Sequence, residues 1–369
     1  MGSITPSSDT ASSFSSSSIC SCTSPNPPYP LHSTILSKLD PTYKSFYNTH
    51  LINNQVVHHQ PLHISRSSSI LLPGASDPIP VGSIFDLKIP QASGSESRLD
   101  NEGENDIDVR VFIPKGEKPE GGWPLCMYFH GGGWVLGGID TENTVCTNLC
   151  QRGEVVVVSV DYRLAPENPY PTAPNDCQTA LLSILHHPTH HSLPINTSLI
   201  ALSGSSAGGN IAAVLSHRFS ALATPIPISV QLLIVPVTDN TASSKTYASW
   251  SENEYSPALP AEKMLWFRHY YLPDEENWED LEASPLLNSR GWERQPRTLV
   301  VVGELDVLRD EGVAYAEKLR KAGVECRLEV MAGMPHPFLA MDGVLKQGAD
   351  TISYMVEELR DVFWKESST

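Results

Sequence analysis

The chain has 369 residues, of which 40% are hydrophobic, enough for one large α/β domain with insertions. Its formal net charge is −17, from 25 Lys and Arg residues against 42 Asp and Glu residues, and it contains no Lys/Arg-rich run. This balance argues against nucleic acid and anionic membranes as partners. Because no run of about 18 apolar residues occurs, we expect no membrane span.

The cysteines indicate a reducing compartment. There are seven, an odd number, and they are scattered, several of them in apolar runs. This pattern favours reduced core thiols in a cytoplasmic protein over a disulfide framework. Cys20 and Cys22 lack a second ligand pair, so we expect no metal there. The N-terminus lacks the basic and hydrophobic regions of a secretory signal peptide.

The first part of the chain precedes any regular alternation of elements. Residues 1–30 are rich in Ser, Thr and Pro, so they bury too little apolar surface to offset ordering entropy, and we expect a disordered tail. Residues 31–63 carry helical sequence, with Asp40 as an N-cap and Pro41 at the first helical position. Residues 65–80 have the Ser, Pro and Gly content of a linker.

Alternating strand and helix segments follow. Eight apolar or β-branched runs predict strands at 81–89, 106–113, 125–129, 155–160, 199–202, 230–235, 298–302 and 327–331. The first two, joined by an acidic loop, are expected to form an edge hairpin, and the fourth to be a central parallel strand. Because helical sequence separates most of the others, we predict an α/β fold: a mostly parallel central sheet flanked by helices.

Residues 240–295 interrupt this alternation. They contain a helical stretch at 261–271 and many aromatic side chains. We interpret them as an insertion over the strand ends that helps to form a lid.

The segment Gly204-Ser205-Ser206-Ala207-Gly208-Gly209 carries a candidate nucleophile. It has the G-x-S-x-G form of a strand-to-helix elbow, which exposes a serine at a sharp turn. The elbow needs small residues two positions before and after its serine, and Gly204 and Gly208 flank Ser206 in this way. Ser205 fits less well, because Ser203 and Ala207 hold the same positions around it. Ser206 is therefore the predicted nucleophile.

The segment His130-Gly131-Gly132-Gly133-Trp134 has the HGGG form of an oxyanion loop. Glycines let backbone N–H groups point at one spot, and we expect the oxyanion donors to be those of Gly132, Gly133 and Ala207. A flexible glycine turn is the alternative interpretation. We expect His130 to organise the loop and not to transfer a proton.

The remaining members of a Ser-Asp-His group are expected after the last two strands. His336 follows the run 327–331 and is the predicted base. Asp306 follows the run 298–302 and is the predicted orienting acid, with Asp310 and Glu304 as alternatives.

Together these motifs resemble the hormone-sensitive-lipase-like branch of the α/β-hydrolases over roughly residues 81–366. The matching segments are the HGGGW loop, the elbow, the His336 loop, Asp161-Tyr162-Arg163-Leu164-Ala165-Pro166-Glu167 and Leu305-Asp306-Val307-Leu308-Arg309-Asp310-Glu311. The resemblance implies an α/β-hydrolase domain with a helical cap built from residues 31–80 and an insertion at about 240–295. It also implies no metal or organic cofactor, and a homodimer contact through the last strand.

The chain departs from the family pattern at two positions. Ser205 stands where the family usually carries Asp, which removes a charge beside the nucleophile. Pro337 follows His336 where the family usually has Gly, which stiffens that loop.

These observations predict a serine hydrolase that cleaves carboxylic esters of small, fairly apolar substrates through an acyl-enzyme. Other readings stay open: a biosynthetic cyclase, dehydratase or transacylase, an amide or formamide hydrolase, and a small-molecule receptor on the same fold. The expected substrate-binding residues are Trp134, Ser205, Trp250, Tyr255 and Phe338, with Trp266 as a further aromatic candidate. For each aromatic residue a core position is an equally open interpretation.

Overall fold

The computed structural model describes residues 28–67, 73–90, 106–188, 191 and 193–365. In this part of the chain eight strands form one sheet in the order β1-β2-β4-β3-β5-β6-β7-β8. They are β1 Ser83–Ile89, β2 Ile107–Ile113, β3 Trp123–Phe129, β4 Val156–Asp161, β5 Ile195–Ser205, β6 Ile228–Ile234, β7 Arg297–Gly303 and β8 Cys326–Met331. The expected mostly parallel α/β sheet is thereby confirmed.

Strand direction changes at one edge of the sheet. β1 and β2 form the expected antiparallel hairpin, in which Ser83 pairs with Ile113 and Ile89 with Ile107. The acidic loop between them lies largely outside the described residues. β4, which we predicted to be a central parallel strand, is parallel to its neighbour β3 but antiparallel to its other neighbour β2. The remaining neighbours, from β3 to β8, are all parallel.

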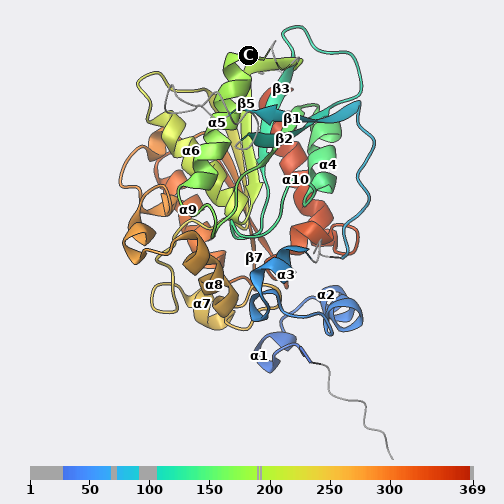
Figure 1. Cartoon of the computed structure of the whole chain (residues 1–369), viewed down its shortest axis with the longest axis vertical. Coiled ribbons are helices and arrows are strands. Elements are labelled where there is room, and N and C mark those ends of the chain that lie inside the picture. The colour runs from blue at the N-terminus through green and yellow to red at the C-terminus, as the bar shows by residue number, and fades with distance from the viewer. Residues whose placement is uncertain (1–27, 68–72, 91–105, 189–190, 192, 366–369) are drawn as a thin grey trace, which may run out of the picture.

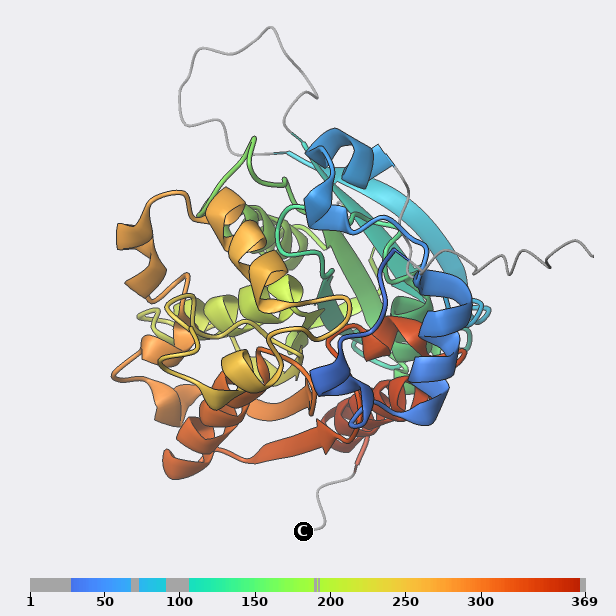
Figure 2. The ribbon, with the colours of Figure 1, turned by 90° about the horizontal axis from the view of Figure 1, so that it is seen from below.

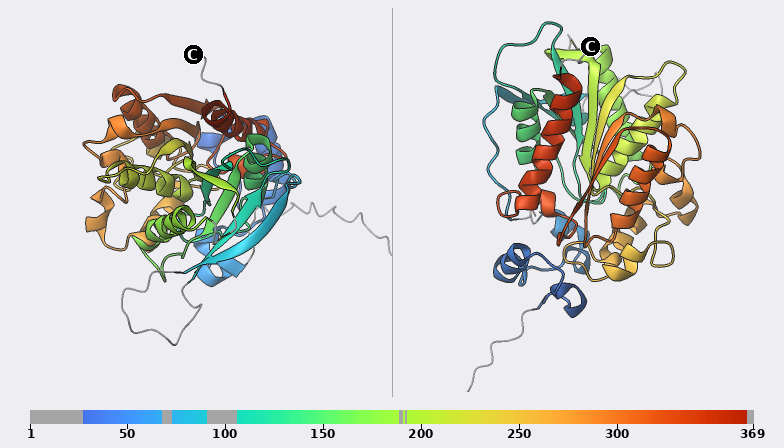
Figure 3. Two further views of the ribbon diagram at one scale, coloured as in Figure 1. Left: turned by 90° about the horizontal axis from the view of Figure 1, so that it is seen from above. Right: turned by 180° about the vertical axis from the view of Figure 1, so that it is seen from behind.

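Helices cover both faces of the sheet (Figures 1 and 3). One face is covered by α4 Asn143–Gly153 and α10 Lys346–Phe363, and the other by α5 Thr172–His186, α6 Ala207–Ser220 and α9 Arg309–Lys321. Two hydrophobic cores result, one on each side of the sheet. All seven residues of β3 are buried, as a strand covered on both faces requires.

Short helices gather at one end of the sheet, below it in Figure 1 and facing the viewer in Figure 2. They are α1 Ser33–Leu36, α2 Pro41–Phe46, α3 Leu62–Ser67, α7 Ala248–Glu252 and α8 Ala261–Tyr271. The N-terminal group and the α7–α8 group touch, since the rings of His32 and Tyr255 lie 4.1 Å apart. Two regions distant in sequence therefore meet at this end.

Local sequence explains the start of α2. The Asp40 carboxylate accepts hydrogen bonds from the backbone N–H groups of Thr42 (2.7 Å) and Tyr43 (3.2 Å), and Pro41 begins the helix. The predicted cap is confirmed here. α3 extends into the region interpreted as a linker, and the tail predicted at 1–30 lies outside the described residues apart from 28–30.

Short 3-10 or π turns complete the described secondary structure. They are η1 Tyr47–Leu51, η2 Val57–His59, η3 Glu275–Glu279, η4 Pro285–Leu287, η5 Trp292–Arg294 and η6 Phe338–Met341. No helix within the described ranges is both long enough and apolar enough to cross a membrane. The five cysteines in those ranges are free thiols, and four of them are buried.

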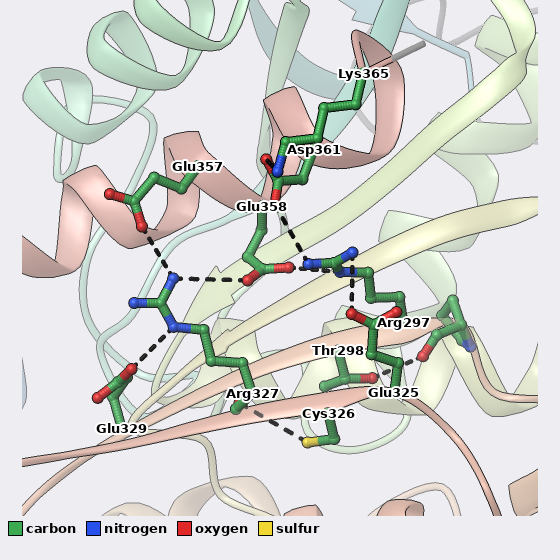
Figure 4. Close-up of polar contacts among 11 residues, drawn as sticks. Arg297, Thr298, Glu325, Cys326, Arg327, Glu329, Glu357, Glu358, Asp361 and Lys365 are labelled. Atoms are coloured by element: carbon green, nitrogen blue, oxygen red, sulfur yellow. Dashed lines mark hydrogen bonds and ion pairs between the residues drawn. The ribbon is translucent and has the colours of Figure 1, made fainter. Parts of the chain in front are cut away.

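A buried carboxylate fastens α10 to the far edge of the sheet (Figure 4). Glu358 is 4% exposed and lies between two arginines, 2.7 Å from Nε of Arg297 on β7 and 3.7 Å from Nη1 of Arg327 on β8. Glu357 and Glu329 pair with Arg327 from more exposed positions. The edge strand β8 and its neighbour β7 are thus tied to the helix by charge as well as by packing.

Candidate active site

Ser206 occupies the sharp turn between β5 and α6. Its φ of 54° and ψ of −116° lie outside the regions that side-chain-bearing residues usually adopt, as in a strained nucleophile elbow. The flanking glycines allow the close approach that this turn needs. A Cβ atom on Gly208 would lie 1.9 Å from the carbonyl oxygen of Phe129, and one on Gly204 would lie 2.4 Å from the backbone of Gly208.

Three side chains meet at this turn from three separate loops. The Oγ atom of Ser206 lies 2.8 Å from Nε2 of His336, and Nδ1 of His336 lies 2.6 Å from Oδ2 of Asp306. Asp306 is fully buried, and its other carboxylate oxygen accepts the N–H of Leu308 at 3.0 Å. The His336 side chain is 12% exposed. The structure therefore brings together the predicted nucleophile, base and acid.

The alternative acids have other partners. Glu304 accepts a hydrogen bond from the N–H of Gly333 (2.7 Å), and Asp310 accepts one from the N–H of Ser249 (2.8 Å). Neither carboxylate is hydrogen-bonded to His336 in the described structure. Glu304 instead joins the loop after β7 to the loop after β8.

Side chains around α7 hold the Asp306 loop in place. Ser249, Asn253 and Ser256 each donate a hydrogen bond to a backbone carbonyl of residues 305–307, at 2.7 Å for Ser249 and 2.9 Å for Asn253. These donors belong to the region 240–295. This region therefore supports the acid loop as well as lying at the end of the sheet.

The HGGG loop runs past the elbow with free backbone donors. Among the described residues, the N–H groups of Gly132, Gly133 and Ala207 have no acceptor. Gly133 has a φ of +62°, and a Cβ atom there would lie 2.3 Å from the ring of Phe267 on α8. Only glycine fits this position without strain, and the ring of Phe267 packs directly on the loop.

Two further contacts hold this loop. The His130 ring stacks on Tyr162 with centroids 4.2 Å apart, and the Tyr162 hydroxyl donates to the His130 carbonyl at 2.8 Å. Burial lowers the pKa of His130 to about 4, so its imidazole stays neutral near pH 7. From α3, Arg66 donates to the carbonyls of Val135 (2.9 Å) and Ala165 (2.5 Å).

Comparison with known proteins identifies the family of this chain. A protein family described as having the alpha/beta hydrolase fold matches residues 126–340 of the chain. The chain belongs to this family. The family expected from the glycine-rich motifs is thereby confirmed.

Individual relatives cover most of this α/β-hydrolase. It is similar to AB hydrolase superfamily protein C1039.03 of Schizosaccharomyces pombe, with 45% identity over 86% of this chain and 92% of that protein. It is 32% identical to an ethyl acetate hydrolase of Pseudomonas putida, over 69% of this chain and 78% of that one. Among solved structures, the hyperthermophilic esterase of Pyrobaculum calidifontis aligns with a TM-score of 0.76 and 28% identity, covering 88% and 98% of the two chains.

Ser205 of this α/β-hydrolase is hydrogen-bonded to a carboxylate and not to His336. Its Oγ donates to Oε1 of Glu142 at 2.6 Å, and Oε2 of the same carboxylate accepts the N–H of Gly131 at 3.2 Å. Ser205 is buried, so it is not placed as a surface for substrate. The sequence does not point to Glu142, because no motif or spacing connects it to the elbow.

The expected aromatic substrate contacts are only partly accessible. Trp134 stacks on Tyr271 at 4.1 Å, Trp250 packs beside the guanidinium of Arg268, and Phe338 lies in the core under α10. All three predicted residues are buried, so the structure does not bring them to an accessible surface. Tyr255 is 49% exposed, so this predicted aromatic residue does lie at an accessible surface.

Phe267 is the aromatic residue that the sequence analysis missed. The structure buries Met264, Phe267, Arg268 and Tyr271 on one face of α8, whereas Trp266 is only half-buried. Counting three- and four-residue steps along 261–271 would have separated these two faces. The helix places Phe267, and not Trp266, on the oxyanion loop.

One group of possible metal ligands occurs in the described part of the chain. His58, His59 and Glu262 bring ligand atoms within 4.8 Å of one another. None of them contacts Ser206, His336 or Asp306 by a hydrogen bond. The pKa of His58 is lowered to about 4, mainly by burial and then by the charges of His59 and Lys263. His58 and His59 lie 3.8 Å and 3.7 Å from the Glu262 carboxylate, so these contacts connect η2 to α8.

Proposed function

We propose that this α/β-hydrolase is a serine carboxylesterase that cleaves esters of small, fairly apolar substrates through an acyl-enzyme. The observation that carries the proposal is the pair of contacts at His336, 2.8 Å from the Ser206 hydroxyl and 2.6 Å from the Asp306 carboxylate. Relatives named as a carboxylesterase and as an ethyl acetate hydrolase support the same reaction class.

In the first half-reaction Ser206 Oγ attacks the ester carbonyl carbon while Nε2 of His336 takes the hydroxyl proton. The carbonyl electrons move to oxygen, and the N–H groups of Gly132, Gly133 and Ala207 stabilise that oxyanion. Asp306 orients the ring and stabilises the imidazolium. Collapse of the intermediate breaks the bond to the alkoxide, which receives the proton from His336.

In the second half-reaction water repeats these steps on the acyl-enzyme. His336 removes a proton from the water molecule, the hydroxide adds to the acyl carbon, and the Ser206 oxygen leaves and recovers its proton. No step needs a metal or an organic cofactor. If an alcohol took the place of water, the same site would act as a transacylase.

We propose that the two groups of short helices form the cap over this site, one within residues 31–80 and one at about 240–295. Phe267 packs on the oxyanion loop, and Tyr255 adds an exposed ring between α7 and α8. Residues 81–366 then form the hydrolase domain, with the second cap group inserted in it at about 240–295.

The test is hydrolysis of p-nitrophenyl esters with acyl chains from acetate to dodecanoate, using the wild type and Ser206→Ala. Activity that peaks at one chain length and disappears in Ser206→Ala supports the proposal. Ser203→Ala is a matched control, because Ser203 lies in β5 and its buried hydroxyl has no partner among the described residues. A Ser206→Ala protein that keeps the wild-type rate would refute the scheme. Formamide and peptide-amide substrates, and added alcohols, separate the other reaction types.

We also propose a cytoplasmic location, supported by the free thiols, and a homodimer through β8. Within the described residues β8 pairs with β7 alone, which leaves its outer edge open, and Val330 on this strand is exposed. Sedimentation of the wild type and of Val330→Lys tests this contact. A wild type that sediments as a monomer at all concentrations would contradict it.

A further inference from the structure

One carboxylate joins the nucleophile elbow to the oxyanion loop. Oε1 of Glu142 accepts the Ser205 hydroxyl at 2.6 Å, and Oε2 accepts the N–H of Gly131 at 3.2 Å. Ser205 precedes the nucleophile, and Gly131 precedes Gly132. Glu142 therefore fixes the spacing between the end of β5 and the loop after β3.

Glu142 is not serving as an ordinary helix cap. It stands at the N-cap position of α4, yet its side chain makes no capping hydrogen bond to that helix. The carboxylate is turned instead towards the site. Its placement also compensates for the departure at Ser205, since a carboxylate stays beside the elbow although it comes from another element.

Four titratable groups face Glu142. They are Tyr128 on β3, Cys146 on α4, Tyr162 after β4 and His336 after β8. Burial raises the pKa of Glu142, and the donors Ser205, Tyr128 and Gly131 together with the His336 charge partly lower it again. Of these facing groups, only His336 can become positive. The carboxylate and the imidazolium therefore stabilise one another.

We propose that Glu142 is a positioning residue for the reaction at Ser206: its carboxylate holds the elbow and the oxyanion loop together and stabilises the imidazolium of His336 as it forms. This inference rests on the proposed function of Ser206, His336 and Asp306. Glu142 touches no reacting atom, so its loss should lower kcat more than it changes KM.

Three variants test the proposal. Glu142→Gln keeps the size of the side chain and removes its charge, and we expect kcat to fall about tenfold, equivalent to about 1.4 kcal/mol. Ser205→Asp places a second carboxylate against Glu142, so we expect a loss at least as large, because adjacent carboxylates resist joint ionisation. The double variant Glu142→Gln/Ser205→Asp again has a single carboxylate at these two positions, now at residue 205. We expect this double variant to recover to within about threefold of the wild type, a non-additive result.

The pH profile separates an electrostatic role from a structural one. Removing the Glu142 charge disfavours the imidazolium, so the half-maximal point on the acid side of kcat/KM should move to lower pH. Glu358→Gln is the matched control, since it also removes a buried carboxylate but lies between β7, β8 and α10. It should leave the profile in place.

Modification of Ser206 by a fluorophosphonate supplies a readout that needs no known substrate. The serine oxygen bonds to phosphorus, fluoride leaves, and the proton passes to His336. A folded wild type that is not labelled would overturn the proposed function and this inference together. If the wild type is labelled and Glu142→Gln is labelled at the same rate at every pH, the proposed role of Glu142 is overturned and the proposed function stands. Purely additive losses in the double variant would also overturn it.

Discussion

The contact between Gly133 and Phe267 makes a sharp prediction about the oxyanion loop. In Gly133→Ala the new methyl group would lie 2.3 Å from ring atoms of Phe267, much closer than any stable contact. Phe267 is itself buried in α8, so its ring has little freedom to move aside. We expect the loop to shift and at least one oxyanion donor to be misplaced.

The magnitude has two parts. A side chain at the φ of +62° costs about 1–2 kcal/mol of stability. Misplacing one donor costs about 2.7–4 kcal/mol in the transition state, so kcat should fall about 100- to 1,000-fold. The activity loss should therefore far exceed the loss of stability.

The assay is kcat on the best p-nitrophenyl ester, normalised by fluorophosphonate titration, together with thermal unfolding. Gly291→Ala is the matched control, because Gly291 has a φ of +81° and nothing within 4 Å of the added methyl group. It should lose stability with little change in kcat. Phe267→Ala in the Gly133→Ala background opens space and should restore part of the rate. A Gly133→Ala enzyme with near-wild-type kcat would refute the reasoning.

Three further predictions concern stability. Glu358→Gln should lower the free energy of unfolding by about 1.5–3 kcal/mol, because it removes the charge of a buried carboxylate that pairs with two partly exposed arginines. Glu357→Gln, at a side chain 57% exposed, should have little effect in the same denaturant titration. Burial raises the pKa of Glu311 to about 8, so the folded state keeps a proton that the unfolded chain releases near pH 4.5, and stability is lost as pH rises towards 8. Glu311→Gln should therefore gain thermal stability over the wild type at pH 9 but not at pH 5, and an equal gain at both values would contradict the assignment. Arg66→Ala removes the hydrogen bonds that join α3 to the carbonyls of Val135 and Ala165, so amide hydrogen exchange in residues 56–67 should become faster. Unchanged exchange in those residues would show that Arg66 does not hold α3 in place.

Some of the structure followed from local chemistry in the sequence. The β-branched and apolar runs predicted all eight strands. The inner strands, such as β3 and β4, are covered on both faces and therefore need continuous apolar sequence. Asp40 and Pro41 predicted the start of α2 for an equally local reason. The glycine spacing around Ser206 separated it from Ser205, and the chain order of the loops indicated Asp306 and His336.

What the sequence did not reveal depends on long-range packing. Trp134 and Phe338 were expected near substrate, but their rings fill space between layers, and nothing in a single sequence distinguishes those uses. Glu142 was missed because its partners are distant in sequence: Gly131 lies 11 residues earlier in the same β3–α4 connection, and Ser205 lies 63 residues later at the end of β5. Arg66 was missed for the same reason, since its acceptors lie far along the chain.

The hydrogen bonds from Ser249, Asn253 and Ser256 to residues 305–307 limit how this enzyme can be recombined. A chimaera that replaced residues 240–295 with the corresponding segment of a relative would change the access route and, unintentionally, the support of the acid loop. A chimaera that retains those three side chains and exchanges only α8 would change the access route and leave the support of the acid loop intact. The boundary for transplanting specificity therefore falls inside the insertion, after Ser256, and not at its two ends.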